Sequence, residues 1–469
     1  MAGASPQRDL TVGPVGKTLF AFAVPSLGVN ILQSMNGSIN AIWVGRILGE
    51  EALAATSNAG MIMFLSFASL FGFSMAATIL IGQAVGRGDT VAVRRTVGSA
   101  VGMFAAAGLA TAVLGWVFAP NVLRALATPA DAFPLALAYS RVIFLGMPFS
   151  FLGILLSSAL RGTGDSVTPL RVTLLNVVLD AGLNPILIMG LGPIPAMGIA
   201  GSALATLVAG LVSMTLLIWQ IYRRDLSIRL RGRELAWLRP SRAYVVPIIA
   251  MGFPMGLSMI VMAGSSLVMI GLVNREGVDT AAAFGVMNQL WSYAQMPAVA
   301  VGGAVSAMVA QNIGAGQWSR VGKIAWAGCG INLLMTATLI LLITLLDQPL
   351  LGLFLTHESP AIPIAVHMNH IIGWSFLLMG VSMVLVSVVR ANGAVMAPLL
   401  MLIFSAIICR LGFGFAFHPI YGADAIWWAF AVGAFISMAQ SVAYYRFGKW
   451  RSLKPRIPAS APTPIAEPG

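Results

Sequence analysis

Charged residues are scarce in this 469-residue sequence. They make up 9% of the chain, and only 15 residues are aspartate or glutamate. Soluble domains carry about 25% charged residues, and the mean hydropathy here is +0.89. These values exclude an ordinary water-soluble protein and predict a chain that lies in a lipid bilayer.

Cysteine is nearly absent as well. The chain has two cysteines, Cys329 and Cys409, and both fall inside apolar stretches. Neither a disulfide framework nor a cysteine metal site is therefore expected. The apolar stretches also lack a cluster of acid, base and nucleophile, so we expect neither an enzyme nor a cofactor.

Long apolar runs are abundant. A helix needs roughly 20 apolar residues to cross a bilayer, and the chain has six such runs in each half. They lie near residues 17–46, 52–82, 96–118, 134–160, 169–191, 197–222, 244–273, 280–310, 324–346, 367–389, 398–418 and 425–445. The predicted fold class is an all-α integral membrane protein with twelve transmembrane helices.

The net charge of +12 follows membrane topology. If the N-terminus is cytoplasmic and the loops alternate, 22 of the 27 lysines and arginines fall on the cytoplasmic side, and four fall on the outer side: Arg46, Arg124, Arg141 and Arg275. This asymmetry is the positive-inside pattern. It predicts cytoplasmic termini in a plasma membrane (the inner membrane of a bacterium), with the lipid bilayer and not nucleic acid as the partner.

The sequence repeats itself at an offset of about 229 residues. The segments 49–55, 82–88 and 159–169 return in order at 277–283, 310–316 and 388–398. A series of matches in register indicates a duplicated unit. We predict two homologous six-helix bundles with pseudo-two-fold symmetry, which can rock about a site between them.

The repeat and the composition together divide the chain into four parts. We predict an N-terminal lobe at 1–222 and a C-terminal lobe at 244–450, joined by a basic cytoplasmic linker at 223–243. The linker is basic enough to lie on an anionic membrane surface. The end of the chain, 451–469, is rich in proline and alanine and is predicted to be a disordered cytoplasmic tail.

Several of these motifs resemble those of the multidrug and toxic compound extrusion (MATE) transporters. The similar segments are 42–46, 82–88, 159–169, 184–188 and 311–316, in that order along nearly the whole chain. The resemblance implies a twelve-helix, two-lobed exporter that is driven by a proton or sodium gradient and commonly expels organic cations. We expect it to act as a monomer.

Asp180 is the acidic residue expected deepest inside an apolar run. A carboxylate there is costly unless it is paired, hydrated or protonated. Asn176 and Asn184 lie one turn to either side on the same helical face, and Pro185 leaves the carbonyl of Ala181 without its donor. We predict an ion-coupling site for a proton, or alternatively sodium. The structural alternative is a neutral aspartic acid that holds helices together.

The first apolar run carries a ladder of polar side chains. Asn30, Gln33, Asn36 and Asn40 recur along it, and we expect Asn36 and Asn40 to help form the ion site and the others to line a substrate cleft. The alternative is that these amides bind neighbouring helices. The resemblance implies that two positions that are acidic in one MATE branch are Asn40 and Asn184 in this chain. Asp180 therefore lies one helical turn away from the acidic position that matches Asn184.

The second copy offers different side chains. Met255, Met259 and Met262 form a thioether stripe that can adapt to varied substrates, although such stripes also serve as packing. Arg410 lies mid-membrane, and it needs an acceptor. We expect these residues to line the substrate cleft, together with two polar side chains of the eighth apolar run, Asn288 and Tyr293.

Three prolines are predicted to break helices. Pro25 and Pro254 occupy matching positions in the two copies, and Pro185 follows Asn184. Each proline removes one backbone donor from its helix.

We therefore predict a secondary active multidrug exporter. It exchanges amphipathic or cationic organic compounds for protons, or for sodium, by alternating access. One alternative is a lipid-linked oligosaccharide flippase of the same superfamily, although few cationic side chains lie in the apolar runs. Another is a non-transporting structural membrane protein.

Overall fold

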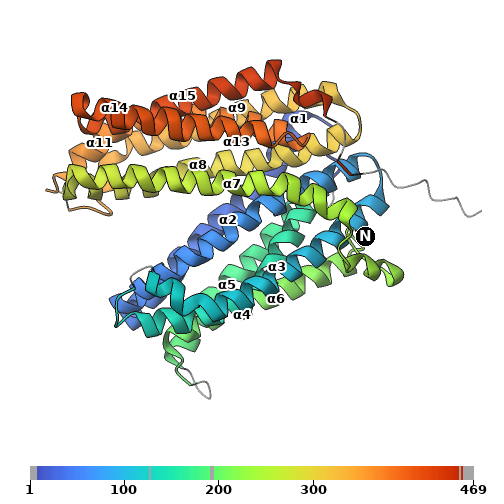
Figure 1. Ribbon diagram of the computed structural model, residues 1–469, viewed down its shortest axis with the longest axis horizontal. Coiled ribbons are helices and arrows are strands. Elements are labelled where there is room, and N and C mark those ends of the chain that lie inside the picture. The colour runs from blue at the N-terminus through green and yellow to red at the C-terminus, as the bar shows by residue number, and fades with distance from the viewer. Residues whose placement is uncertain (1–7, 126–127, 191–194, 357, 454–455, 458–469) are drawn as a thin grey trace, which may run out of the picture. The chain divides into compact units, whose positions relative to one another are not determined.

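The computed structural model describes residues 8–125, 128–190, 195–356, 358–453 and 456–457 (Figure 1). Within these ranges, 11 helices are long and apolar enough to cross a membrane, or up to 12 if a bent pair is one span. The predicted all-α, twelve-span architecture is confirmed.

Each predicted apolar run of the first half is one helix. These helices are α1 (Val15–Leu48), α2 (Glu50–Gly86), α3 (Thr90–Ala125), α4 (Phe133–Gly162), α5 (Val167–Met189) and α6 (Gly198–Arg223). They extend past the apolar runs at several ends, because a polar turn can continue a helix into the interface.

The second half is less regular. Its single-helix spans are α7 (Arg242–Val273), α8 (Val278–Gly314), α9 (Trp318–Leu345) and α15 (Ala423–Phe447). The tenth span is a pair bent by 44°, α11 (Ala361–Ile372) and α12 (Ser375–Ala391). The eleventh is α13 (Met396–Ile403), a π-helical segment η3 (Phe404–Leu411) and α14 (Gly412–Tyr421). Short helices are η1 (Gly232–Leu238), η2 (Asn274–Glu276), α10 (Asp347–Leu351) and η4 (Lys449–Ser452).

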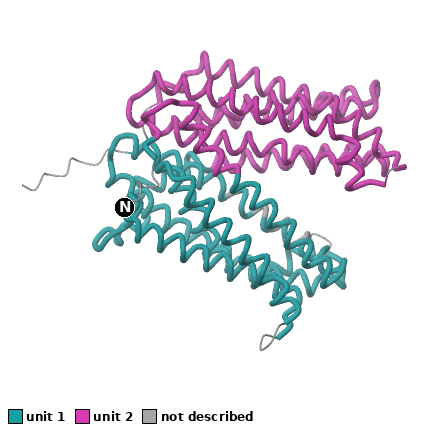
Figure 2. The backbone as a smooth tube through the Cα atoms, turned by 180° about the vertical axis from the view of Figure 1, so that it is seen from behind, with its two compact units in different colours: residues 1–9, 28–252, 456–469 teal, residues 10–27, 253–455 magenta. Residues whose placement is uncertain are grey.

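The chain forms two compact units (Figure 2). Residues Gly28–Gly252 make up the body of the first, which we call the N-lobe. Residues Phe253–Pro455 make up the body of the second, the C-lobe, which also takes in Leu10–Leu27. The N-lobe therefore contains the inter-repeat linker and the start of α7, whereas the start of α1 belongs to the C-lobe.

The same helix pairs meet in both lobes. In the N-lobe, α4 packs against α2, α3 and α6, and α5 packs against α6. In the C-lobe, α12 packs against α8, α9 and α15, and α14 packs against α15. The duplication read from the sequence thus recurs as a duplicated packing scheme.

Glycines at matching positions make the turns of both copies. Gly88 and Gly316 have φ of 72° and 74°, and Gly164 and Gly393 both have φ of 90°. Side chains other than glycine rarely adopt this conformation. These glycines therefore allow the tight interhelical turns of both copies.

The turn after α4 also starts α5. The Asp165 carboxylate accepts hydrogen bonds from the backbone N–H groups of Val167 (3.0 Å) and Thr168 (2.9 Å). These donors lack intrahelical acceptors in the first turn, so the buried Asp165 acts as a helix cap.

The three prolines do not break their helices. α1, α5 and α7 continue through Pro25, Pro185 and Pro254 without interruption. The predicted helix breaks are therefore wrong. Each proline still removes one hydrogen bond, but packing against the neighbouring helices holds the backbone helical on both sides.

The N-terminal segment is tied to the C-lobe. The N–H of Leu10 donates to Oε1 of Gln311 (3.2 Å), and Nδ2 of Asn312 donates to the carbonyl of Leu10 (3.0 Å). Arg320 donates to the carbonyl of Gly13 (3.0 Å) and to Oδ1 of Asn312 (3.0 Å). Leu10 itself is fully buried.

The predicted disordered tail mostly lies outside the described residues, which end at Leu453 apart from residues 456–457. Its first two residues belong to η4.

The turn geometry predicts unequal costs for two glycine substitutions. Gly88→Ala introduces only backbone strain, about 1 kcal/mol, because no atom lies within 4 Å of the added Cβ. Gly164→Ala adds a clash, since its Cβ would collide with the carbonyl oxygen of Arg8. In thermal unfolding of the purified protein, the melting temperature should fall further for Gly164→Ala than for Gly88→Ala. Equal decreases would contradict this account.

Candidate functional site

Asp180 is buried in the middle of α5, with 1% of its surface exposed. Its Oδ1 accepts hydrogen bonds from the hydroxyl of Thr206 on α6 (3.0 Å) and from Nδ2 of Asn184 (3.2 Å). Asn184 also donates to the backbone carbonyl of Asp180 (3.1 Å). The carboxylate is thus held between two helices by neutral donors, and among the described residues no cation pairs with it.

Two amide oxygens near this carboxylate lack a donor. Oδ1 of Asn184 and Oδ1 of Asn36 are both buried, and neither has a hydrogen-bond partner. The Asn36 amide also interacts with the Asp180 carboxylate. Buried acceptors without donors are costly. These oxygens could coordinate a bound cation, or accept a hydrogen bond from a water or from a protonated Asp180.

Asn40 joins the same helices one turn further along. Its Oδ1 accepts a hydrogen bond from Ser202 on α6 (2.7 Å), and its Nδ2 donates to the hydroxyl of Tyr139 on α4 (3.3 Å). Ser202 lies one turn before Thr206, whose hydroxyl binds Asp180. The polar network therefore links α1, α4, α5 and α6, and one path from Asn40 to Asp180 runs through Ser202 and Thr206 of α6.

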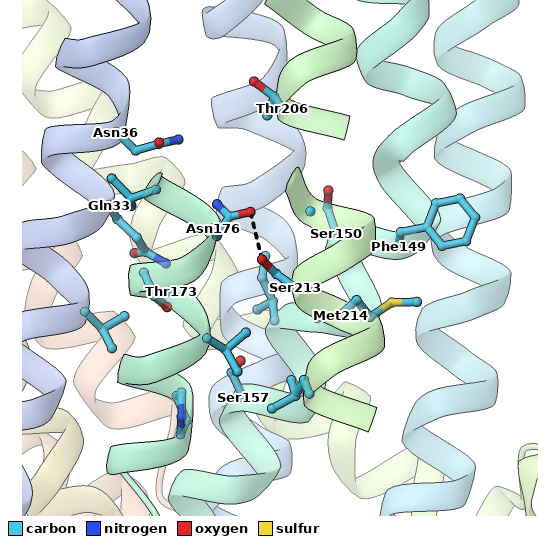
Figure 3. A pocket seen from close by; sticks show the side chains of 18 of the residues that line it. Gln33, Asn36, Phe149, Ser150, Ser157, Thr173, Asn176, Thr206, Ser213 and Met214 are labelled. Atoms are coloured by element: carbon cyan, nitrogen blue, oxygen red, sulfur yellow. Dashed lines mark hydrogen bonds between the residues drawn. The ribbon is translucent and has the colours of Figure 1, made fainter. Parts of the chain in front are cut away.

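A pocket of about 290 Å³ opens beside this network, within the N-lobe (Figure 3). Asn36 and Thr206 lie toward one end of the view and Ser157 toward the other. The polar side chains that line it are Gln33, Asn36, Ser150, Ser157, Arg161, Thr173, Asn176, Thr206 and Ser213. They alternate with apolar residues of α1, α4, α5 and α6, so the lining suits an amphipathic molecule.

Asn176 turns away from Asp180. Its Oδ1 accepts a hydrogen bond from the hydroxyl of Ser213 (3.4 Å), as the dashed line in Figure 3 shows. Of the two flanking amides predicted to join the ion site, Asn184 contacts the carboxylate and Asn176 lines the pocket instead.

Arg161 is the charged side chain among the residues that line this pocket. Its Nη2 donates to the hydroxyl of Ser158 (2.7 Å), and no carboxylate within the described ranges pairs with it. A guanidinium offers five donors. The pocket is therefore basic toward the Ser157 end and neutral toward Asp180.

The polar residues of α1 that were predicted to line the substrate cleft or the ion site do not all lie in the pocket. Gln33 and Asn36 line the pocket, whereas Asn30 is half-buried and lies outside that lining.

The C-lobe residues do not gather into one cluster. Met255 is buried, Met259 is half-buried and Met262 is 43% exposed, so the methionine stripe turns from the core to the surface along α7. On α8, Asn288 and Tyr293 are exposed, and the Tyr293 hydroxyl accepts a hydrogen bond from Gln289 (3.3 Å).

Arg410 lies in the π-helical segment η3. Its guanidinium carbon stands 3.7 Å from the centre of the Phe430 ring on α15. Its Nε is buried without a hydrogen-bond partner. Arg410, which was expected to line the substrate cleft, thus packs on the aromatic face of Phe430.

The partners supplied by α6 were missed from the sequence. Ser202, Thr206 and Ser213 recur at spacings of four and seven, which puts them on one helical face. This periodicity was available, but hydroxyls in membrane helices commonly bond to their own backbone. Within the described ranges, no group of three or more His, Cys, Asp or Glu residues could hold a metal ion.

Comparisons with known proteins agree with this architecture. The MatE family profile matches residues 25–186 and 254–416, one segment in each repeat. The chain is 32% identical over 435 residues to the probable multidrug resistance protein YoeA of Bacillus subtilis, covering 92% of this chain and 94% of that one. It is 29% identical over 446 residues to YpnP of the same organism, another probable multidrug resistance protein, covering 95% and 98%.

A solved structure shares the fold. A mutant of the Vibrio cholerae MATE transporter VcmN superposes with a TM-score of 0.86 at 20% identity, over 95% of this chain and 99% of that one. The family match spans both repeats, and the first relative is similar over nearly its full length. The chain belongs to the MatE family, a family of transporters and not of enzymes.

Proposed function

We propose that this protein is a secondary active multidrug exporter that expels amphipathic or cationic organic compounds in exchange for protons. The buried Asp180 carboxylate, held by Thr206 and Asn184 beside a polar pocket, is the observation that carries the proposal. Two relatives named as probable multidrug resistance proteins support the substrate class. The basic loops support cytoplasmic termini in a plasma membrane, and we propose a monomer.

The coupling step takes place at Asp180. When the carboxyl binds a proton it gains a donor, and the buried amide oxygen of Asn36 or Asn184 can accept it. Loss of that proton leaves a charge that Thr206 and Asn184 stabilise. The two protonation states therefore favour different arrangements of the same helices, and a ligand shifts an equilibrium only through such differential affinity.

Sodium is the alternative coupling ion. The carboxylate and the two amide oxygens are hard oxygen ligands, and sodium would satisfy the same unpaired acceptors. We favour the proton because one carboxylate suffices to bind it, whereas tight sodium sites collect more charged or carbonyl ligands. The alternating-access motion of two lobes follows from the duplicated architecture.

The substrate is proposed to bind within the N-lobe pocket. Its amide and hydroxyl groups can hydrogen-bond varied compounds, and its apolar residues can contact their rings. Because Arg161 makes one end basic, a cationic group is expected to point toward Asn36 and Thr206, near Asp180.

Replacement of the coupling acid tests the function. In proteoliposomes assayed with a fluorescent organic cation, Asp180→Asn should abolish transport driven by a pH gradient, because the amide cannot exchange a proton. Substrate binding to the purified variant should persist. The control Asp131→Asn removes an exposed acid in the loop between α3 and α4 and should transport normally.

The gradients separate the two ions. Wild-type protein should respond to an imposed pH gradient and not to a sodium gradient at constant pH. A response to sodium alone would replace the proton with sodium. Unchanged ion dependence in Asp180→Asn would refute the coupling site itself.

Removal of one hydroxyl should shift the pH dependence of transport. Thr206→Val takes away a hydrogen bond to the Asp180 carboxylate, so the pH profile of transport should move away from that of the wild type. Thr215→Val is the matched control, since that hydroxyl on α6 donates only to the backbone of Leu211. Identical pH profiles for the two variants would contradict the proposed role of Thr206.

A further inference from the structure

We propose that a second pocket, between α3 and the inter-repeat linker, binds the anionic headgroup of a membrane phospholipid. The phosphate would lie between the guanidinium groups of Arg95 and Arg239. The proposal is independent of the exported substrate and of the coupling ion, because it concerns a different surface of the N-lobe.

The linker is strongly basic, and its acids are already paired. Its arginines are residues 223, 224, 229, 231, 233, 239 and 242, and its acids are Asp225 and Glu234. Asp225 pairs with Arg231 and with Arg229 (3.3 Å), and the hydrogen bond from Arg231 lowers the pKa of Asp225. Glu234 pairs with Arg94 (2.8 Å). Neither acid is left to neutralise Arg95 or Arg239.

The linker is seated on α3 by close backbone contact. A Cβ at Gly102 would collide with the carbonyl oxygen of Leu238, and one at Gly98 would stand 2.9 Å from that of Trp237. Only glycine permits this approach. The N–H of Ser241 also donates to the hydroxyl of Ser99 (3.4 Å). The site is therefore built on a fixed segment of chain.

Between the linker and α3 lies a cavity of about 310 Å³. Its lining includes Arg95, Ser99, Trp237, Arg239 and Tyr244. Arg95 stacks over the Trp237 ring at 5.2 Å, which fixes the guanidinium plane without using its N–H donors. Neither arginine has an ion pair within the described ranges. Guanidinium groups in such positions bind phosphate oxygens well.

The surroundings favour a lipid as the source of the phosphate. Arg95 lies at the polar start of α3, one residue before the apolar run begins, so the cavity is at the level of lipid headgroups. Leu235 and Leu238 of η1 are 50% and 37% exposed, and residues three apart in a 3₁₀-helix share a face. Exposed leucines beside arginines are typical of a segment that lies in a membrane interface, and basic pockets there bind lipid headgroups.

The test compares two double variants with the same change in charge. The purified full-length protein is incorporated into nanodiscs of phosphatidylcholine with increasing phosphatidylglycerol, and the bound lipid is counted by native mass spectrometry. Arg95→Gln with Arg239→Gln should weaken phosphatidylglycerol binding about 10- to 30-fold. The control, Arg224→Gln with Arg233→Gln, changes linker arginines that do not line the cavity and should bind like wild type.

Three outcomes would overturn the proposal. Equal losses in both double variants would mean a diffuse surface charge effect, and equal binding of phosphatidylcholine would mean no selectivity for an anion. Displacement of the lipid by millimolar inorganic phosphate or glycerol 3-phosphate would identify a soluble phosphate as the ligand. If the pocket variant does not fold, the single charge reversal Arg239→Glu on the exposed linker replaces it in the same comparison.

Discussion

In the apolar interior of a bilayer no water is at hand, so peptide groups have to find their hydrogen-bond partners inside the protein, and an unpaired polar side chain is costly. This constraint makes the spans helical, and it also sorts their polar side chains. Many hydroxyls bond to their own helix, as Ser26 does to the carbonyl of Phe22 and Thr338 to that of Leu334. Other polar side chains bond between helices, and Asp180 and Asn40 do so where α1, α4, α5 and α6 of the N-lobe meet.

Much of the fold was predictable because lipid imposes length and composition. The apolar runs and the duplication were both read correctly from sequence. The bend between α11 and α12 and the π-helix around Arg410 were not, since neither has a distinctive residue pattern. At Pro25 and Pro185 the sequence predicted helix breaks that the structure does not have. A proline removes one hydrogen bond, but packing decides whether the helix continues.

The candidate site was only partly predictable. Asp180 stood out because a deep acid is rare, and Asn184 follows it at helical spacing. Its other partner, Thr206, comes from a different helix, and which face of α6 meets α5 depends on packing that one sequence does not reveal. The same limit explains Asn176, whose spacing from Asp180 is favourable but whose hydrogen-bond partner, Ser213, lies on α6.

The two copies share one scheme of helix packing, but their buried polar side chains differ. The position equivalent to Asp180 falls at Cys409, beside Arg410, in a span that contains a π-helical segment. Arg410 covers the ring of Phe430, whereas Asp180 accepts from hydroxyl and amide donors. An acidic side chain in one lobe and a basic side chain in the other make the two copies chemically different despite the duplicated backbone.

The hydrogen bonds of Leu10 with Gln311 and Asn312 also bear on biosynthesis. The segment 10–27 belongs to the C-lobe, yet it is synthesised before the N-lobe that separates it from the rest of that unit. Leu10 therefore cannot make these hydrogen bonds until about 300 further residues have been synthesised. During that interval the start of α1 lacks the helices that it packs with in the C-lobe, so this lobe is completed only by contacts between segments that are far apart in the sequence.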